Sequence, residues 1–493
     1  MIKKEIHARQ LGLGPEVSGH DTLPQLRRYD GILINVPIAL GGRPDEGEYP
    51  AFGLGRIAAT MWNNYGLSCG IIDAQQINKG EGRMDLSELM RQIKLTNPTV
   101  VGLNPTSINF DVARSIADAL EEYSIPYVLG GYFATLAPEF ALKIFPQAAA
   151  IVCGKGEIAM SKITAVIKEG GMSLDSANID GVYTATHTPS KTRTEELGDT
   201  EWPDVDPALY YYHPFEESEK NGRKIVKARL YETEGCPYRC GFCSSCAIHK
   251  QRYRRPSMNQ IVNDVERVIH MGANRVHFLD DLLLAKPEHV FDFLKEIKKR
   301  NLHEKFDWQG MSRANLIAKW DNEVLDALKD SGCFHIAFGV ESGSENILKK
   351  ITKGISPDEV LTATRRLAER GIGVKGFFIL GFPDETEEEM QETIHLALRM
   401  AEEGATHISL FQFQPYPGTA LYEEIMRTKP EVLKELGYYD KESIYTSGKL
   451  RTAAYLPDSI QLSKVLNSRI RDLIPATTAE FYRRVEKRKT KLG

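Results

Sequence analysis

The chain has 493 residues, a formal net charge of −5 and 42% hydrophobic residues, which is long enough for about two to four domains with cores of their own. The slight acidic excess argues against a broad nucleic-acid-binding surface. No apolar run approaches the ~20 residues that span a bilayer, and the first residues lack the apolar stretch of a signal peptide, so we expect a cytoplasmic protein without a membrane span.

The first part of the chain predicts strands that alternate with helices. After a polar N-terminal extension over 1–30, short apolar runs indicate strands at 32–36, 68–73, 99–103, 127–129 and 149–153. Helical patterns lie between them at 53–65, 85–95, 110–123 and 138–144. This alternation predicts an α/β fold with a doubly wound, Rossmann-like parallel sheet over 31–165.

A second alternating series follows a connector over 166–225. Its predicted strands lie at 226–233, 274–280, 305–310, 334–340, 373–380 and 406–412. Its predicted helices lie at 257–271, 287–300, 320–330, 356–370 and 385–403. Six β/α units predict a partial TIM-like barrel over 226–425, shorter than the eight units of a full barrel. The rest of the chain, 426–493, is predicted to be a helical C-terminal region.

Cysteines cluster after the first strand of this second series. Cys236, Cys240 and Cys243 have the spacing C-x3-C-x2-C, and thiolates gathered on one loop suit a soft metal or an iron–sulfur cluster. Three cysteines leave one iron of a cubane without a protein ligand, open to chemistry. The alternatives are a structural zinc site with Cys246 as fourth ligand, or chance clustering, although zinc sites usually draw their ligands as two separated pairs.

This spacing, placed after the first strand of a β/α series, resembles the radical S-adenosylmethionine (SAM) superfamily. The resemblance implies that Cys236, Cys240 and Cys243 hold a [4Fe-4S] cluster whose fourth iron binds the amine and carboxylate of SAM. One electron, from a donor such as flavodoxin or ferredoxin, then cleaves SAM to a 5′-deoxyadenosyl radical. Cys246 lies beyond the family positions and is expected to be a structural thiol.

Motifs at the predicted strand ends extend the resemblance. They are His277-Phe-Leu-Asp-Asp, Trp308-Gln-Gly-Met-Ser-Arg, Gly339-Val-Glu-Ser-Gly and the segment 376–386. In the last of these, Phe377 and Asp384 stand where the family's adenine-binding element has glycine and glutamate. The alternatives are solvated turns, helix caps and a surface arginine. The SAM contacts that the resemblance implies are Phe242, Asp280, Arg313 (to the methionine carboxylate), Glu341, Ser342 and Ile379.

The first part of the chain resembles the cobalamin-binding domain that precedes many radical SAM domains. Four segments carry this resemblance, at 49–59, 99–107, 128–131 and 152–157. The alternative is that their glycines only form the turns of an α/β sheet. The implied cobalamin contacts are Asn104, Thr106, Ser107, Gly130 and Gly131.

Two features set this part of the chain apart from histidine-ligated cobalamin domains. No histidine lies between 21 and 186, and Phe133 stands where relatives often carry histidine. Any cobalamin is therefore expected to bind without a histidine on cobalt. The same absence fits relatives whose domain holds no cobalamin.

The resemblance implies a cobalamin-dependent enzyme that methylates an unactivated carbon of a small-molecule or peptide substrate. The deoxyadenosyl radical would abstract hydrogen, and methylcobalamin would supply the methyl group. The alternative is a radical SAM enzyme that catalyses dehydration, cyclisation, epimerisation or oxidation, with a cobalamin-type domain that is empty. A non-enzymatic metal-binding scaffold is the third hypothesis, and no nucleic acid partner is expected.

Overall fold

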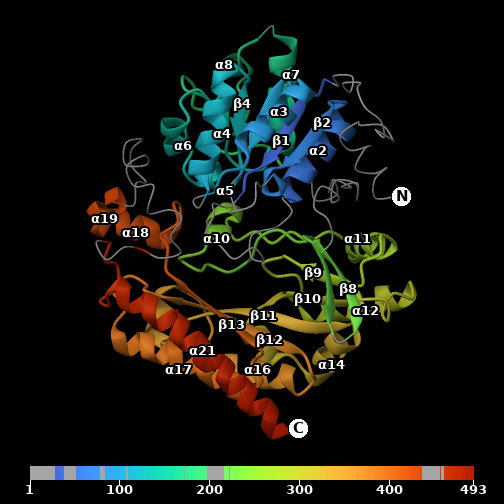
Figure 1. Ribbon diagram of the computed structural model, residues 1–493, viewed down its shortest axis with the longest axis vertical. Helices are drawn as coiled ribbons and strands as arrows, with labels where there is room; N and C mark the ends of the chain where they lie inside the picture. The colour runs from blue at the N-terminus through green and yellow to red at the C-terminus, as the bar shows by residue number, and fades with distance from the viewer. Residues whose placement is uncertain are drawn as a thin grey trace. The chain divides into compact units, whose positions relative to one another are not determined.

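The computed structural model describes residues 28–37, 52–77, 84–106, 109–170, 172–196, 216–220, 222–435, 456 and 460–492. These residues divide into two compact units, one over 28–196 and the other over 216–492 (Figure 1). Residues 1–27 of the predicted extension over 1–30 lie outside the described residues. No helix in the described ranges is long and apolar enough to cross a membrane.

The first unit is a six-stranded sheet in the order β2-β1-β3-β4-β5-β6. Five strands are parallel, and β6 (Val182–Tyr183) pairs antiparallel with β5. The order of the parallel strands is that of a doubly wound flavodoxin-like sheet, so the predicted Rossmann-like fold is confirmed. The parallel strands are β1 (Gly31–Asn35), β2 (Cys69–Asp73), β3 (Val100–Leu103), β4 (Tyr127–Leu129) and β5 (Ala150–Val152).

Helices cover both faces of this sheet (Figure 1), and each face has its own core. Ile32 and Ile34 of β1 belong to the cluster that includes α3, α4 and α6, whereas Leu33 belongs to the cluster with α2 and α7. Burial on both faces explains the continuous apolar run of β1. The helices are α2 (Phe52–Tyr65), α3 (Leu86–Thr96), α4 (Phe110–Glu122), α5 (Gly131–Leu136), α6 (Pro138–Ile144), α7 (Gly156–Glu169) and α8 (Leu174–Ala177).

The second unit is an open seven-stranded sheet in the order β13-β12-β11-β10-β9-β8-β7. Six strands are parallel, and β7 (Glu216–Lys220) pairs antiparallel with β8 at one edge. The sheet does not close, which confirms the predicted partial barrel. The parallel strands are β8 (Arg223–Leu230), β9 (Arg275–Phe278), β10 (Asp307–Ser312), β11 (Cys333–Glu341), β12 (Gly373–Leu380) and β13 (His407–Gln412).

The helices of the second unit follow its strands in turn, and three begin with a capping box: Ser257 with Gln260, Ser356 with Glu359, and Thr386 with Glu389. The long helices are α11 (Met258–His270), α12 (Pro287–Lys299), α14 (Asn322–Asp330), α16 (Pro357–Ala368), α17 (Glu387–Glu403) and α21 (Asn467–Leu492). The shorter ones are α10 (Ser244–His249), α13 (Ala314–Lys319), α15 (Glu345–Lys350), α18 (Ala420–Thr428) and α19 (Pro430–Glu435).

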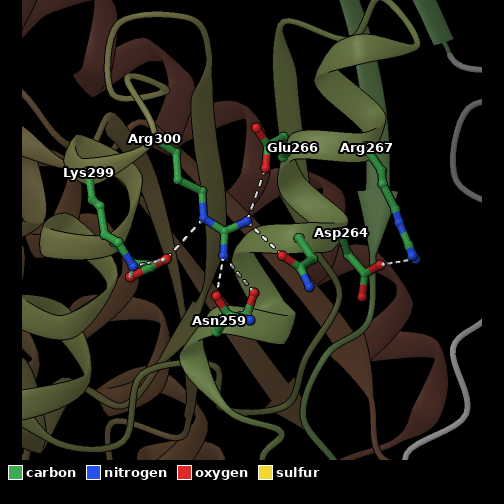
Figure 2. A network of polar contacts seen from close by, with 8 residues as sticks. Asn259, Asp264, Glu266, Arg267, Lys299 and Arg300 are labelled. Carbon is green, nitrogen blue, oxygen red and sulfur yellow. Dashed lines mark hydrogen bonds and ion pairs between the residues drawn. The ribbon is translucent and has the colours of Figure 1, made fainter.

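Polar contacts fix the first two long helices of this unit to each other. Arg300, which follows α12, donates to Glu296 of its own helix at 2.9 Å and to Glu266 of α11 at 3.0 Å (Figure 2). The same guanidinium donates to Asn263 and Asn259 of α11. Because Arg300 is largely buried, this network orients α11, the helix that follows the cysteine loop.

Candidate functional site

The cysteine loop runs from the carboxyl end of β8 to α11 and is held at its base. Glu234 and Arg254 exchange main-chain hydrogen bonds of 2.9 and 3.0 Å across it. Gly235 has φ +74°, and a Cβ there would overlap the carbonyl of Arg252. Further along, Gly241 N–H donates to the carbonyl of Ile351 at 2.9 Å. The loop is therefore a fixed structure that presents its thiols together.

The three predicted cluster ligands are free thiols on this loop, with Cys240 buried and the other two partly buried. Burial raises the pKa of the Cys236 thiol, and it raises the pKa of Cys243 to about 12. Metal or cluster binding must therefore displace protons. In the described part of the chain, no three cysteine, histidine or carboxylate side chains converge on one ion position. A cubane carries its thiolates on separate irons, so its ligands need not converge on a point.

Arg313 lies beside these thiols. Its Nη1 donates to Cys240 Sγ at 3.8 Å, and its Nη2 donates to the carbonyl of Lys353. Its guanidinium carbon stands 3.6 Å from the centre of the Tyr238 ring. The residues present thus fit a cluster, because one loop carries three thiols and a buried cation contacts one of them, Cys240.

Asp280, at the end of β9, has no exposed surface and binds main chain. Its Oδ1 accepts from the N–H groups of Glu232 and Thr233, which lead into the cysteine loop. Burial raises the pKa of Asp280 to about 6. Asp280 therefore fastens the loop to β9, and its contact with SAM stays a prediction. The neighbouring Asp281 is exposed and accepts from Ser245 Oγ at 2.5 Å.

Glu341, at the end of β11, forms a buried ion pair that the sequence did not reveal. Its Oε1 accepts from Lys353 Nζ at 2.7 Å, with side chains 9% and 8% exposed. Glu341 has φ +69°, next to a register shift between β11 and β12. Such a backbone costs about 1–3 kcal/mol and is typical of functional sites. A Cβ at Gly339 would overlap both charged groups, so only glycine leaves room for the pair.

Ser342 has its hydroxyl engaged within the protein. Its Oγ lies 2.9 Å from Thr393 Oγ1 of α17 and accepts from Ser344 N–H at 3.1 Å. Gly343 N–H donates to the same threonine at 2.9 Å. The Gly-Val-Glu-Ser-Gly segment is thus anchored to α17, and a SAM contact by Ser342 stays a prediction.

Aromatic rings pack around Phe242, the residue that precedes Cys243. Phe242 meets the ring of Phe382 edge-on at 5.8 Å, and Phe382 contacts Phe413 at 5.2 Å. Ile379 of β12 is half-buried and pairs in register with Phe411 of β13, which is 50% exposed. Phe242 and Ile379 lie on elements that meet at the carboxyl edge of the sheet, where this fold places its chemistry.

The buried carboxylate of the predicted adenine-binding element is Glu385, one position later than the Asp384 that the sequence motif indicated. Glu385 is fully buried, and its Oε2 accepts from the N–H groups of Gly381 (2.6 Å) and Phe382 (3.1 Å). Asp384 instead pairs with Lys429 and Lys350 at 2.9 and 3.2 Å, with 56% of its side chain exposed. The following Thr386 and its capping box are the signal that marks this position.

Burial raises the pKa of Glu385 to about 8, from an ordinary value of 4.5. Between these values the folded protein holds a proton that the unfolded chain has released, so the free energy of unfolding falls as the pH rises. Glu385→Gln is expected to flatten this decline in urea unfolding between pH 5 and 8. Asp384→Asn, the control, should keep the wild-type slope, because the pKa of Asp384 is lowered. An unchanged slope in Glu385→Gln would contradict the assignment.

The first unit brings four predicted cobalamin contacts together at the carboxyl ends of β3 and β4. Asn104 Oδ1 accepts from Val36 N–H, after β1, at 3.1 Å. A Cβ on Gly131, which has φ +81°, would lie 3.5 Å from the Cβ of Asn104, and a Cβ on Gly130 would meet nothing within 4 Å. Thr106 lies on the same loop, and Ser107 lies outside the described residues.

Asn109 organises this edge, although the sequence did not single it out. Its Nδ2 donates to the carbonyl of Val36 at 3.0 Å, and its Oδ1 accepts from Thr106 N–H (2.6 Å) and Oγ1 (2.9 Å). The loops after β1 and β3 are thus joined at the point where the strand order reverses, the usual ligand crevice of such sheets. A side chain at Gly130 would meet no neighbour within 4 Å, so the backbone there is uncrowded. Phe133 is buried against Phe140 and offers no ligand.

Two family models match the chain: the radical SAM superfamily over residues 231–397 and the B12 binding domain over residues 39–164. An uncharacterized methyltransferase of Pyrococcus horikoshii is 28% identical over 69% of this chain and 72% of its own length. The cytidylyl-2-hydroxyethylphosphonate methyltransferase of Streptomyces wedmorensis is 26% identical over 86% of this chain and 85% of its own. The anaerobic magnesium-protoporphyrin IX monomethyl ester cyclase of Rubrivivax gelatinosus is 25% identical over 69% and 61%.

Solved structures share the fold. The radical SAM methyltransferase TsrM from Kitasatospora setae, with cobalamin and a [4Fe-4S] cluster bound, has a TM-score of 0.63 at 19% identity over 81% of this chain and 78% of its own. The cobalamin-dependent radical enzyme OxsB has a TM-score of 0.58 at 17% identity over 88% and 61%. The combination of a doubly wound sheet with an open half-barrel therefore occurs in known proteins.

Proposed function

We propose a function on this premise: the chain belongs to the radical SAM superfamily, in the subgroup that carries a B12-binding domain. The enzyme methylates an unactivated carbon of a small-molecule or peptide substrate, with cobalamin as methyl carrier and flavodoxin or ferredoxin as reductant. The observation that carries the proposal is the similarity to a methyltransferase across 86% of the chain, which spans both units.

When bound, the cluster supplies one electron to SAM, SAM supplies the radical and the methyl group, and cobalamin carries that methyl group to the substrate. Cys236, Cys240 and Cys243 would hold the cluster. Arg313 and Asp280 fix the loop that presents them. Glu341 would bind a hydroxyl or the ammonium of SAM, and Phe242 and Ile379 would exclude water around it. Asn104, Thr106, Gly130 and Gly131 would contact the corrin, and no side chain between residues 21 and 186 is a histidine that could bind cobalt.

The test needs no knowledge of the substrate. Reconstituted protein is incubated without oxygen with cobalamin, a chemical reductant and SAM that carries a trideuterated methyl group. The expected result is corrin that stays with the protein on a desalting column and gains the deuterated methyl by mass spectrometry. Deoxyadenosine from uncoupled SAM cleavage is the second expected product. Retained corrin without deuterated methyl would contradict the methyl-transfer proposal.

A second function is favoured by the cyclase among the relatives. It is a radical SAM reaction such as cyclisation, oxidation, dehydration or epimerisation, in which the B12-binding domain takes no methyl group. This alternative predicts deoxyadenosine formation with no corrin retained, or with retained corrin that stays unmethylated. The same desalting and mass measurements therefore separate the two functions.

A further inference from the structure

Among the described residues, no carboxylate pairs with the buried cation Arg313. It is 7% exposed and follows β10 directly. Within the described residues its polar contacts are Cys240 Sγ, the Lys353 carbonyl and Asn315 Oδ1, and its flat face covers Tyr238. A buried charge is costly unless an opposite charge compensates it. The thiols of the cysteine loop, once ionised, are the anions that this site provides.

Two other cations near Arg313 are either paired or exposed. Lys353 is paired with Glu341, and Arg239 is exposed and donates to Gln251. Asp281, the carboxylate that follows Asp280, is exposed and bound to Ser245. Arg313 is therefore a buried cation that contacts the Cys240 thiol and, among the described residues, binds no carboxylate.

We propose that Arg313 is a positioning residue for the iron–sulfur cluster: it donates to the Cys240 thiolate and raises the reduction potential of the cluster. This inference rests on the proposed function, and it differs from a contact between Arg313 and the SAM carboxylate. One-electron reduction adds a negative charge to the cluster and its thiolates, so a nearby cation and an N–H···S bond stabilise the reduced form more than the oxidised form. The guanidinium is held in place by Tyr238 and the Lys353 carbonyl.

The test is a redox titration of the cluster-loaded protein with dithionite, followed by electron paramagnetic resonance, for wild type and Arg313→Gln. We expect the equilibrium constant for cluster reduction to fall about tenfold, which is about 59 mV for one electron. The dissociation constant for SAM, measured by equilibrium dialysis on the oxidised cluster, is expected to stay within about twofold. Arg365→Gln removes an arginine that is 53% exposed and paired with Glu403, and it should leave both quantities unchanged.

Two results with Arg313→Gln would overturn the inference. An unchanged potential with weakened SAM binding would assign Arg313 to the SAM carboxylate, and an unchanged potential with unchanged SAM binding would leave it no role at the site. If Arg313→Gln takes up no cluster, Arg313→Lys decides, because lysine keeps the charge but loses the planar fork. In Arg313→Lys the equilibrium constant for cluster reduction should fall by less than tenfold. A reduction potential equal to that of the wild-type protein would overturn the inference. Wild-type protein that takes up no cluster would instead contradict the proposed function.

Discussion

Replacing Cys240 with alanine is expected to remove the iron–sulfur cluster and all cleavage of SAM. Cys240 is the buried member of the three thiols, and it accepts from Arg313. Its loss leaves two thiolates and an unpaired buried guanidinium, so activity should fall by more than the ~10–100-fold typical of changes outside the ligand shell. Iron and sulfide content per chain and deoxyadenosine formation measure the outcome.

The matched control is Cys246→Ala. Cys246 lies in α10, three residues after Cys243, and is half-buried. It should keep iron, sulfide and SAM cleavage at wild-type levels. Loss of metal in both variants, with zinc and not iron in the wild-type protein, would support the four-cysteine zinc site instead. Cobalamin retention should survive Cys240→Ala, because the proposed corrin contacts lie in the first unit.

The positions of the parallel strands were predictable because a run of apolar residues marks each strand. The run of Ile32, Leu33 and Ile34 is buried on both faces of its sheet, and such a run is typical of a strand inside a parallel sheet. The antiparallel edge strands β6 and β7 were missed, because two and five residues with polar neighbours give no clear period. Helices α10, α13 and α15 were missed because six residues are too few for helical periodicity.

The cysteines and strand-end motifs were predictable because the chemistry needs fixed spacings along one loop. Their hydrogen-bond and ion-pair partners were not, because these contacts depend on how the backbone folds after each strand. Lys353, which follows α15, pairs with Glu341 next to a register shift, and Glu385 binds the main chain of Gly381 four positions earlier. Asn109 binds the main chain of Val36, 73 positions earlier. Each of these contacts depends on how segments approach one another in the fold, which local sequence does not encode.

Replacing Lys353 with methionine is expected to lower the free energy of unfolding of the second unit by about 3–5 kcal/mol, because the change leaves the Glu341 carboxylate buried without its cation. Both side chains are less than a tenth exposed, so solvent screens the pair little. Urea unfolding of the cluster-free protein at pH 7 measures the change. Lys319→Met is the control: Lys319 is 70% exposed and pairs with Glu359, so its loss should cost about 1 kcal/mol or less.

The double variant Lys353→Met with Glu341→Gln separates stability from cofactor binding. Because the uncompensated charge is gone, most of the lost stability should return, as in other buried pairs removed together. SAM binding should be weaker than in the wild-type protein, since the predicted contact is made by the Glu341 carboxylate, which this variant lacks. A double variant as unstable as Lys353→Met would mean that the lysine acts through packing and not through its charge. A stable double variant that binds SAM as tightly as the wild-type protein would show that Glu341 does not contact SAM. Gly339, Glu341 and Lys353 would then have only a structural role at the end of β11.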